Sequence, residues 1–274
     1  MTSVSPLPAE VTMTPAAARL HHASIVLSPG EDAALDLTIF VSCYNEAAYI
    51  VSTLDTVRAA LTEVGGIEYE IIVIDDCSRD RSAELVENYV REHPNDRILL
   101  RRNDGNRGLA QNYVDAAFIG KGKYYRLICG DDAEPKDTMV TVFREIGKAD
   151  ILIPYYAESE GRSLYRRLLS SAYTWLVNLI GGHKINYYNG LAVHLRYNVM
   201  RWHPATRGFG FQADIICMLL DQGLGYRQIA VRTVERKGAD SSALAFKNVL
   251  SVAHTLVDLV FRRISHLVYR RRKR

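Results

Sequence analysis

Short apolar runs alternate with amphipathic stretches along residues 37–154. Thr38–Cys43 and Tyr69–Ile74 are apolar and rich in β-branched residues, a pattern typical of buried strands. Glu46–Leu61 and Arg81–Arg91 follow them with apolar residues at helical spacing. The alternation continues with expected strands at Arg97–Leu100, Tyr124–Cys129 and Asp150–Pro154, and expected helices at Leu109–Ile119 and Pro135–Ile146. The pattern predicts an α/β fold with a Rossmann-like, open and mostly parallel sheet flanked by helices.

The two ends of the chain differ from this middle part. Residues 1–36 are rich in Pro, Ala, Ser and Thr without a sustained period, which favours a flexible leader before a domain over residues 37–240. Residues 241–274 contain apolar residues spaced three and four apart, which predicts an amphipathic helix, and then the basic run Arg270–Arg274. We expect this segment to bind a membrane surface. The alternatives are a helix packed on the domain and weak, nonspecific nucleic-acid binding.

Composition and charge narrow the class of protein. The chain of 274 residues is 48% hydrophobic and 24% charged, as in a soluble protein with a sizeable core. The net charge of +3 comes from basic residues in 262–274, and the rest is net negative, so nucleic acid is not an expected partner. Four scattered cysteines without a CxxC pair indicate free thiols in a reducing cytosol. With neither a secretory signal nor a long apolar run recognised, we expect a cytoplasmic location.

Polar residues follow the expected strands. Tyr44-Asn45-Glu46 comes after the first strand, Asp75-Asp76 after the second and Asp131-Asp132 after the fourth. In a parallel α/β sheet these positions share the edge where ligands bind. Clustered carboxylates need a compensating cation or hydrogen-bond donors, and such oxygen ligands suit Mg²⁺ or Mn²⁺. The alternative is helix capping, which we favour for Asp80 but not for Asp131-Asp132, because one cap does not need two acids.

Several catalytic signatures are missing from the sequence. No GxxxxGK[ST] loop occurs, which excludes a P-loop nucleotidase. No GxGxxG follows the first strand, which argues against a nicotinamide or flavin dehydrogenase. The histidines show no HExxH spacing, so we interpret them as surface or packing residues.

Four motifs in order carry a family resemblance. TIFVSCYNEAAYI, EIIVIDDCSRD, NRGLAQN and LICGDDAEP, within residues 38–154, resemble family 2 glycosyltransferases of the GT-A fold. The second half resembles one branch of that family, the polyprenyl-phosphate sugar transferases similar to dolichyl-phosphate mannosyltransferase. The similarity there lies in SLYRRLLSSAYTWLVNLIGG (163–182), YYNGLAVHLR (187–196), GFGFQADIICMLLDQGLGYRQIAV (208–231) and ERKGADSS (235–242).

The resemblance implies roles for the residues at the strand ends. Tyr44, Asn45 and Glu46 would line a nucleotide-sugar site, in which Asp75-Asp76 holds the base and ribose. Asp132 would be the direct ligand of a metal that bridges the diphosphate, and Asp131 would supply the second carboxylate. The chain departs from the family pattern at three positions, where Gly130 replaces the first Asp of the DxD motif, Ser42 replaces a Pro and Cys77 replaces a Gly.

The acceptor side leaves two alternatives. A hydroxyl acceptor needs a carboxylate base, and the resemblance places Asp214 there; a helix first-turn aspartate is the other interpretation. A lipid phosphate is already anionic and needs cations, and Arg166, Arg167 and Arg236 match the phosphate-contacting positions of the branch. A solvated basic helix face is the alternative for Arg167. The branch often has Gly-Ser-Arg where this chain has Pro154-Tyr155-Tyr156.

The predicted function is that of an inverting, metal-dependent glycosyltransferase, with Asp132 and Asp214 as catalytic candidates. It would move a sugar from a nucleoside diphosphate sugar to a polyprenyl phosphate, peripherally at the cytoplasmic face of the membrane. The alternative acceptor is a hydroxyl of a growing glycan or lipid-linked saccharide. A nucleotidyltransferase also uses paired carboxylates and a metal but would show a Gly-rich loop after the first strand, and a noncatalytic binding module would not need Asp132.

Overall fold

The computed structural model describes residues 25–26, 35–160, 164–204, 210–234 and 246–270. They form an eight-stranded sheet in the order β1-β4-β3-β2-β5-β7-β6-β8. Strands β2 to β5 run parallel, β7 is antiparallel between β5 and β6, and β8 is parallel to β6. The strands are β1 (Ile25–Val26), β2 (Leu37–Cys43), β3 (Tyr69–Asp75), β4 (Ile98–Arg102), β5 (Tyr124–Cys129), β6 (Ile151–Glu160), β7 (Val193–Leu195) and β8 (Tyr226–Val234).

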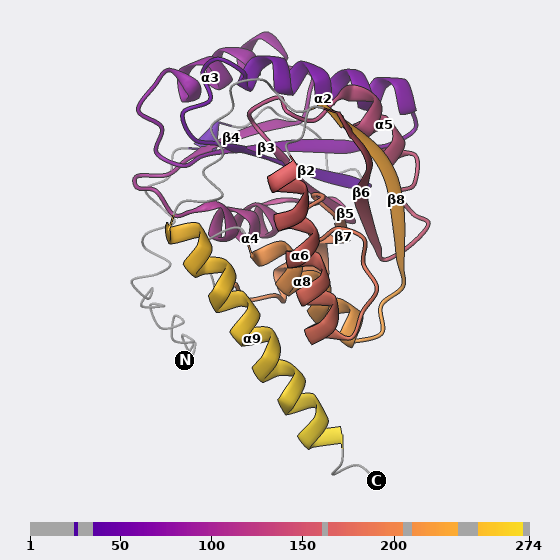
Figure 1. The fold of residues 1–274 in the computed structure, drawn as a ribbon. Helices are drawn as coiled ribbons and strands as arrows, with labels where there is room; N and C mark the ends of the chain where they lie inside the picture. Colours follow the sequence, from indigo (N-terminus) through magenta and orange to yellow (C-terminus); the bar gives the residue numbers. More distant parts are fainter. Residues whose placement is uncertain (1–24, 27–34, 161–163, 205–209, 235–245, 271–274) are drawn as a thin grey trace, which may run out of the picture.

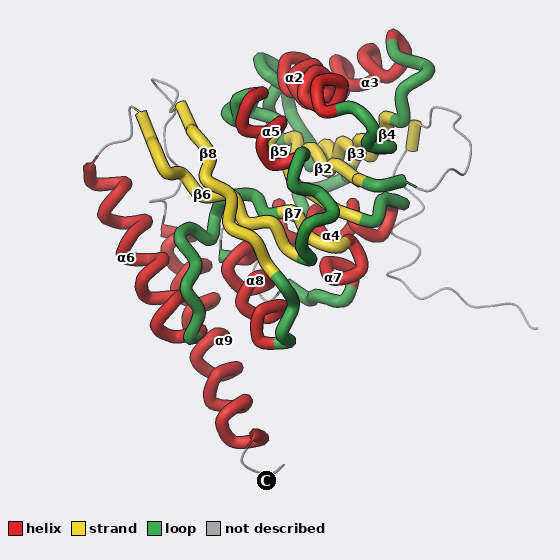
Figure 2. Tube along the Cα trace, turned by 90° about the vertical axis from the view of Figure 1, so that its right-hand side faces the viewer, coloured by secondary structure: helices red, strands yellow, loops and turns green. Residues whose placement is uncertain are grey.

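Helices cover both faces of this sheet, as Figures 1 and 2 show. One face packs against α2, α3 and α5, and the other against α4, α7 and α8, with one apolar core on each side. A sheet buried on both faces accounts for the nearly unbroken apolar strands in the sequence. The helices are α2 (Ile50–Val64), α3 (Ser82–Glu92), α4 (Leu109–Ile119), α5 (Lys136–Phe143), α6 (Leu164–Gly181), α7 (Arg196–Met200), α8 (Phe211–Asp221) and α9 (Phe246–Arg270).

The predicted α/β sheet is confirmed, although several bounds differ; helix α5, for example, ends at Phe143 rather than Ile146. Helix α2 begins at Ile50 rather than Glu46, because the preceding residues form turns that are hydrogen-bonded to a neighbouring loop. Strand β6 continues to Glu160 because it pairs with β8 along its length, an interaction between distant segments that local spacing does not report. Ile25–Val26 lie in the expected leader, yet they pair with β4 as an edge strand.

Helix α9 lies beside α6 and α8, and its last turns extend past the other helices in Figure 1. Thr255 and Leu259 are buried on its inner face, and Gly210 lets the helix approach, since a Cβ there would lie 2.1 Å from Thr255 Oγ1. Its outer face exposes Phe261 and Ile264. The helix therefore packs on the domain through one face and leaves apolar side chains exposed on another. Within the described residues, no helix combines the length and hydropathy that a membrane crossing needs.

Candidate active site at the carboxyl edge of the sheet

The three polar segments predicted at the strand ends do lie at one edge of the sheet. Strands β2, β3 and β5 are parallel, with Cys43 opposite Asp75 and Ser42 opposite Cys129. The chain leaves all three strands at the same level, so the loops that begin at Tyr44, Asp76 and Gly130 are neighbours. The structure thus brings together every donor-side residue that the sequence singled out.

Hydrogen bonds fasten the first of these loops to the second. The Asn45 backbone N–H donates to Ser78 Oγ (2.9 Å), and Asn45 Oδ1 accepts from the Arg79 backbone N–H (2.8 Å). The Glu46 backbone N–H donates to Ser82 Oγ at 2.8 Å. These bonds run in both directions, so the segment Tyr44–Glu46 is held against the loop after β3 before any ligand binds.

Asp80 extends this contact, in agreement with its interpretation as a helix cap. Its carboxylate accepts from the backbone N–H groups of Ala47 and Ser82, each at 3.0 Å. Asp80 is exposed, and although the desolvation that remains raises its pKa, the Ser82 hydroxyl and these backbone donors lower that pKa below the usual value. Asp80 therefore stays ionised and joins the start of α3 to the loop after β2.

Non-glycine residues with a positive φ concentrate at the same edge. Asn45, Cys77 and Asp132 have φ values of 57°, 66° and 51°. Such a conformation costs roughly 1–3 kcal/mol for an ordinary residue and persists only where the surrounding structure imposes it. Cys77 stands where the resembling family has a glycine, and its left-handed backbone explains why a glycine suits that position. Backbone strain is thus stored at the candidate site.

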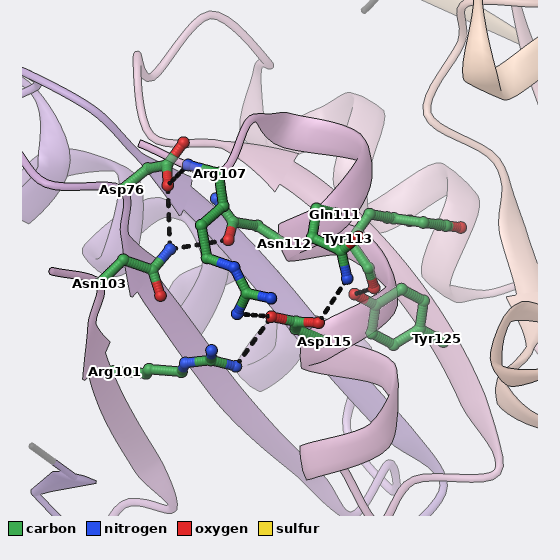
Figure 3. Close-up of polar contacts among 9 residues, drawn as sticks. All are labelled: Asp76, Arg101, Asn103, Arg107, Gln111, Asn112, Tyr113, Asp115 and Tyr125. Carbon is green, nitrogen blue, oxygen red and sulfur yellow. Dashed lines mark hydrogen bonds and ion pairs between the residues drawn. The ribbon is translucent and has the colours of Figure 1, made fainter. Parts of the chain in front are cut away.

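Asp76 organises the loop that follows β4, as Figure 3 shows. Its Oδ1 accepts from Asn103 Nδ2 (2.9 Å) and from the Arg107 backbone N–H (2.8 Å), and its Oδ2 accepts from the Gly108 backbone N–H (2.9 Å). Asn103 Nδ2 also donates to Asn112 Oδ1 at 2.8 Å. Since Gly108 directly precedes α4, Asp76 fixes both the loop and the start of that helix.

Arg107 connects this cluster to a second one, also visible in Figure 3. Its guanidinium lies 2.5 Å from Asp115 Oδ2, and the buried Arg101 reaches the same oxygen at 3.1 Å. Gln111 Nε2 donates to the other oxygen of Asp115 at 2.8 Å. Asp76 and Asp115 thus hold the segment between β4 and α4 from its two sides, which leaves its backbone little freedom.

Asp75 differs from Asp76 because its carboxylate is only partly satisfied. The residue is 3% exposed, and its Oδ2 accepts from the Ser78 backbone N–H at 3.2 Å. Its Oδ1 is buried and has no hydrogen-bond partner within the described part of the chain. A buried carboxylate oxygen without a partner is costly, so a hydrogen-bond donor on a ligand would be favourable here. Asp75, rather than Asp76, has a carboxylate oxygen left to accept a further hydrogen bond.

The third loop, Gly130–Pro135, is called the carboxylate loop below. Gly130 cannot be replaced by the family's aspartate without movement, because a Cβ there would lie 2.5 Å from the Ser42 carbonyl oxygen. Asp131 is half-buried, and its Oδ1 accepts from the Ala133 backbone N–H at 3.2 Å. Asp132 Oδ2 accepts from Ser52 Oγ (2.7 Å) and its Oδ1 from Thr56 Oγ1 (3.3 Å). Asp132 therefore faces helix α2.

The side chains of the carboxylate loop are of the type that binds a hard divalent cation. Two adjacent carboxylates that are not fully buried, together with substrate phosphates, form a common Mg²⁺ arrangement. The described residues contain no group of three or more metal-ligating side chains. Asp132 would have to exchange its contacts with the α2 hydroxyls for contacts with a cation. Asp131 and Asp132 thus fit the group by residue type.

The sequence left two interpretations of Asp214, an acceptor base or an aspartate in the first turn of a helix. It lies in the first turn of α8 and is 5% exposed. Trp202 Nε1 donates to its Oδ2 at 2.7 Å, while Arg262 of α9 donates to its Oδ1 and, at 3.2 Å, to its carbonyl oxygen. Both carboxylate oxygens are engaged by buried or half-buried donors. The structure therefore places Asp214 in an ion pair between α8 and α9, and its role as an acceptor base stays a prediction.

The basic acceptor-side candidates are only partly described. Arg167 is exposed on α6, next to Arg166 in the same helix, whose side chain is not among the described ones. Arg236 lies outside the described residues. The solvated-face interpretation of Arg167 agrees with its exposure.

The comparisons with known proteins agree with this geometry. The model of glycosyl transferase family 2 matches residues 38–203, more than half of the chain. The chain belongs to glycosyl transferase family 2. Family membership and fold indicate a transferase. Its relatives include a dolichyl-phosphate beta-glucosyltransferase of Dictyostelium discoideum, 26% identical over 82% of this chain and 74% of that protein. Dolichol-phosphate mannosyltransferase of Saccharomyces cerevisiae is 28% identical over 50% of this chain and 52% of that protein.

Solved structures place this family 2 chain in the GT-A fold. Glucosyl-3-phosphoglycerate synthase from Mycobacterium tuberculosis, in complex with UDP, has a TM-score of 0.61 at 15% identity, covering 82% of this chain and 80% of that one. A mannosyltransferase from Pyrobaculum calidifontis, in complex with GDP-Man and Mn²⁺, has a TM-score of 0.57 at 17% identity, covering 87% and 73%. At these identities the likeness concerns the fold, and it confirms the predicted fold class.

Several residues of the site were not singled out from the sequence of this family 2 chain. Asn103 supports Asp76, Arg262 and Trp202 hold Asp214, and Arg126 reaches Glu134 of the carboxylate loop. Only Arg126 left a clear signal, since a charged residue interrupts the apolar strand YYRLIC. The others are contacts between distant segments.

Proposed function

We propose that this protein transfers a sugar from a nucleoside diphosphate sugar to a polyprenyl phosphate, with inversion at the anomeric carbon. The observation that carries the acceptor assignment is the buried ion pair of Asp214 with Arg262. A hydroxyl acceptor would need a carboxylate base within about 3 Å. The only acidic residue expected there already accepts hydrogen bonds at both oxygens. A phosphate acceptor is a nucleophile without deprotonation, so the engaged Asp214 is no obstacle.

The donor would bind along the edge formed by the loops after β2, β3 and β5. Asp75 offers a buried carboxylate oxygen to a donor group of the nucleotide, and Tyr44, Asn45 and Glu46 line the neighbouring loop. Asp76 contributes by fixing the loop to α4 rather than by offering a free oxygen. Two of the solved neighbours hold UDP or GDP-Man, which supports a nucleotide-activated donor for this fold.

Asp131 and Asp132 would hold the divalent cation, Mg²⁺ or Mn²⁺, in this proposal. Breaking the bond between the anomeric carbon and the diphosphate oxygen leaves negative charge on the diphosphate, and a bound cation supplies Lewis-acid stabilisation of that charge. The carboxylate loop keeps the two acids beside the end of β5, where the diphosphate would lie. The Mn²⁺ in the Pyrobaculum complex supports a divalent cation in this fold.

The acceptor phosphate would approach from the side of α6 and α9. Attack on the anomeric carbon from the face opposite the leaving diphosphate inverts the centre in one displacement, and no proton is removed from the nucleophile. The basic candidates Arg166, Arg167 and Arg236 would neutralise the acceptor phosphate. The names of the Dictyostelium and yeast relatives refer to dolichyl-phosphate and dolichol-phosphate, which supports this acceptor class.

We propose further that helices α6 and α9 rest on the cytoplasmic surface of the membrane that holds the acceptor. They lie side by side, and together they expose large apolar side chains, including Trp175, Leu179, Phe261 and Ile264. The basic run Arg270–Arg274 follows directly at the end of α9. Apolar area next to clustered basic charge is the combination that binds anionic bilayer surfaces. The enzyme would be a peripheral protein.

The acceptor class can be tested with paired acceptors. Purified protein with Mn²⁺ and a panel of nucleotide sugars is incubated with a polyprenyl phosphate or with the matched polyprenol, which differs only in its terminal group. We expect mass spectrometry to find a hexosyl phosphate product with the phosphate and none with the alcohol. Transfer to the alcohol, or to a saccharide hydroxyl only, would favour the alternative hydroxyl acceptor instead.

A further inference from the structure

A buried arginine in the middle of the sheet contacts two loops of the candidate site. Arg126 lies on β5, between Ile39 of β2 and Val193 of β7, and its side chain is 1% exposed. Burying a guanidinium costs several kcal/mol unless it is paired and hydrogen-bonded. An apolar residue would fill this strand position at no such cost. The partners of Arg126 therefore identify what the charge does there.

The first partner belongs to the carboxylate loop. Arg126 Nη2 lies 2.5 Å from Glu134 Oε1, and the Glu134 side chain is 15% exposed. Glu134 comes two residues after Asp132, whose backbone has a φ of 51°. The ion pair thus fastens the loop just beyond its strained residue.

The second partner lies in the turn Asn189–Ala192, called the facing turn here. Arg126 Nε donates to the Leu191 carbonyl oxygen at 3.3 Å, and Leu191 also has a left-handed backbone, with a φ of 50°. The turn leads into β7, which is antiparallel to β5 with Val193 opposite Arg126. It therefore lies at the same sheet edge as the carboxylate loop. Gly190 packs it against β6, since a Cβ would lie 1.9 Å from the Pro154 carbonyl oxygen.

The pairing also leaves two atoms without partners. Arg126 Nη1 and Glu134 Oε2 are buried and accept or donate no hydrogen bond within the described residues. The third contact of the guanidinium is the ring of Phe143 on α5, 5.4 Å from its centre. The Arg126 guanidinium therefore does more than neutralise Glu134, because it contacts the carboxylate loop, the facing turn and helix α5. A lysine, with a single point of charge, cannot reproduce those three contacts.

We infer that Arg126 is a positioning residue that sets the place of the carboxylate loop relative to the facing turn, through Glu134 and the Leu191 carbonyl. This inference rests on the proposed function for its kinetic consequence, since the carboxylate loop would hold the leaving diphosphate. The facing turn lies at the same sheet edge as that loop. Misplacement of reacting groups by about 1 Å can lower a rate about 100-fold without loss of substrate binding.

Hydrogen–deuterium exchange tests the inference without requiring activity. In Arg126→Met we expect exchange to rise at least about tenfold in both residues 130–135 and 189–192. The matched control is Arg101→Met, which removes an equally buried arginine from β4, where it pairs with Asp115. We expect that control to leave both segments unchanged. A rise in only one segment, or the same rise in the control, would overturn the inference.

Kinetics provide the second readout. We expect Arg126→Met to lower kcat about 10- to 100-fold while KM for the nucleotide sugar changes less than threefold, and Arg126→Lys to restore stability but not kcat. If Arg126→Met does not fold, Arg126→Lys carries both measurements; native kcat and native exchange in the lysine variant would overturn the inference. If the native protein transfers no sugar, the proposed function fails, and the exchange experiment still decides whether Arg126 couples the two segments.

Discussion

Two regions of this molecule are built in different ways. The first is the sheet edge formed by the loops after β2, β3 and β5, called the donor edge here, and the second is the side formed by helices α6 and α9. At the donor edge, polar side chains hold one another, as in the three hydrogen bonds that Asp76 accepts and the bonds that fasten Asn45 to the loop after β3. On the other side, Trp175 and Phe261 are 64% and 66% exposed on adjoining helices. The first region is prepared for a small polar ligand, and the second exposes an apolar surface larger than scattered single residues would give.

In the function proposed above, this difference corresponds to different roles for the two regions. A nucleotide and its diphosphate need fixed donors and acceptors, which a preorganised network supplies at little cost on binding. A lipid needs apolar surface and a few cations, and it tolerates an imprecise fit. Arg262 joins the α6–α9 side to the core, because it lies on α9 and pairs with the buried Asp214 of α8.

The largest expected effect comes from Asp132→Asn at the donor edge. The amide keeps an oxygen for Ser52 or Thr56 but loses the charge that a cation needs. We expect transfer to fall at least about 100- to 1000-fold, in the range seen when one electrostatic stabiliser is removed. Transfer measured with radiolabelled donor checks this, and urea unfolding should show a change below about 1 kcal/mol. Turnover within threefold of native would remove Asp132 from the chemistry.

Asp76→Ala breaks the network that defines the donor edge. It leaves the buried Asn103 and the half-buried backbone N–H groups of Arg107 and Gly108 without the Asp76 carboxylate, and an unsatisfied donor costs about 1–3 kcal/mol when it is buried and less when water reaches it. We expect the free energy of unfolding to fall by about 3 kcal/mol, measured in urea. The matched change Asp104→Ala, at an exposed position of the same loop, should cost less than about 0.5 kcal/mol. Equal costs for both would show that the network contributes nothing.

Trp175→Ser with Phe261→Ser tests the apolar side. Each side chain would contribute about 1.5–3 kcal/mol if it were buried in a bilayer interface. We expect sedimentation with anionic vesicles to show at least tenfold weaker binding, with unchanged unfolding in urea and unchanged transfer to a detergent-solubilised acceptor. Phe118→Ser is the control, since Phe118 is 59% exposed but lies on α4. If the control weakens vesicle binding equally, the membrane does not contact α6 and α9.

His194, on strand β7 between β5 and β6, provides a smaller test based on pH. It lies on β7 between Tyr125 of β5 and Ile151 of β6, and complete burial lowers its pKa to about 3. The native state therefore stays neutral while the unfolded chain binds a proton below about pH 6.5, so stability falls as pH falls from 6.5 toward 3. For His194→Phe we expect the loss of stability between pH 7 and pH 5 to shrink by about 2 kcal/mol in total, measured by urea unfolding at both pH values. Identical slopes in both proteins would mean that His194 titrates normally.

The donor edge was predictable from sequence to a much greater extent than the other side. Parallel strands end at a common edge, so Asp75, Asp76 and Asp132 follow from the strand pattern alone, and the bounds of α4 and β5 agree with the apolar spacing. The contacts that support this edge were not predictable, since Asn103 reaches Asp76 from the end of another strand and Arg126 joins Glu134 to the Leu191 carbonyl. Asp214 shows the limit most clearly: its first-turn position was visible in the sequence, but Arg262, 48 residues later, decides its environment.

The most direct test of the account is turnover by an enzyme whose Asp214 carboxylate is removed together with its partner. In Asp214→Asn/Arg262→Gln both charges are lost, so no uncompensated charge stays buried. With a polyprenyl phosphate acceptor we expect transfer within about tenfold of native, while Asp132→Asn in the same assay loses about 100-fold or more. If the folded double variant loses as much transfer as Asp132→Asn does, Asp214 acts as a base, and the claim of an anionic acceptor that needs none is contradicted.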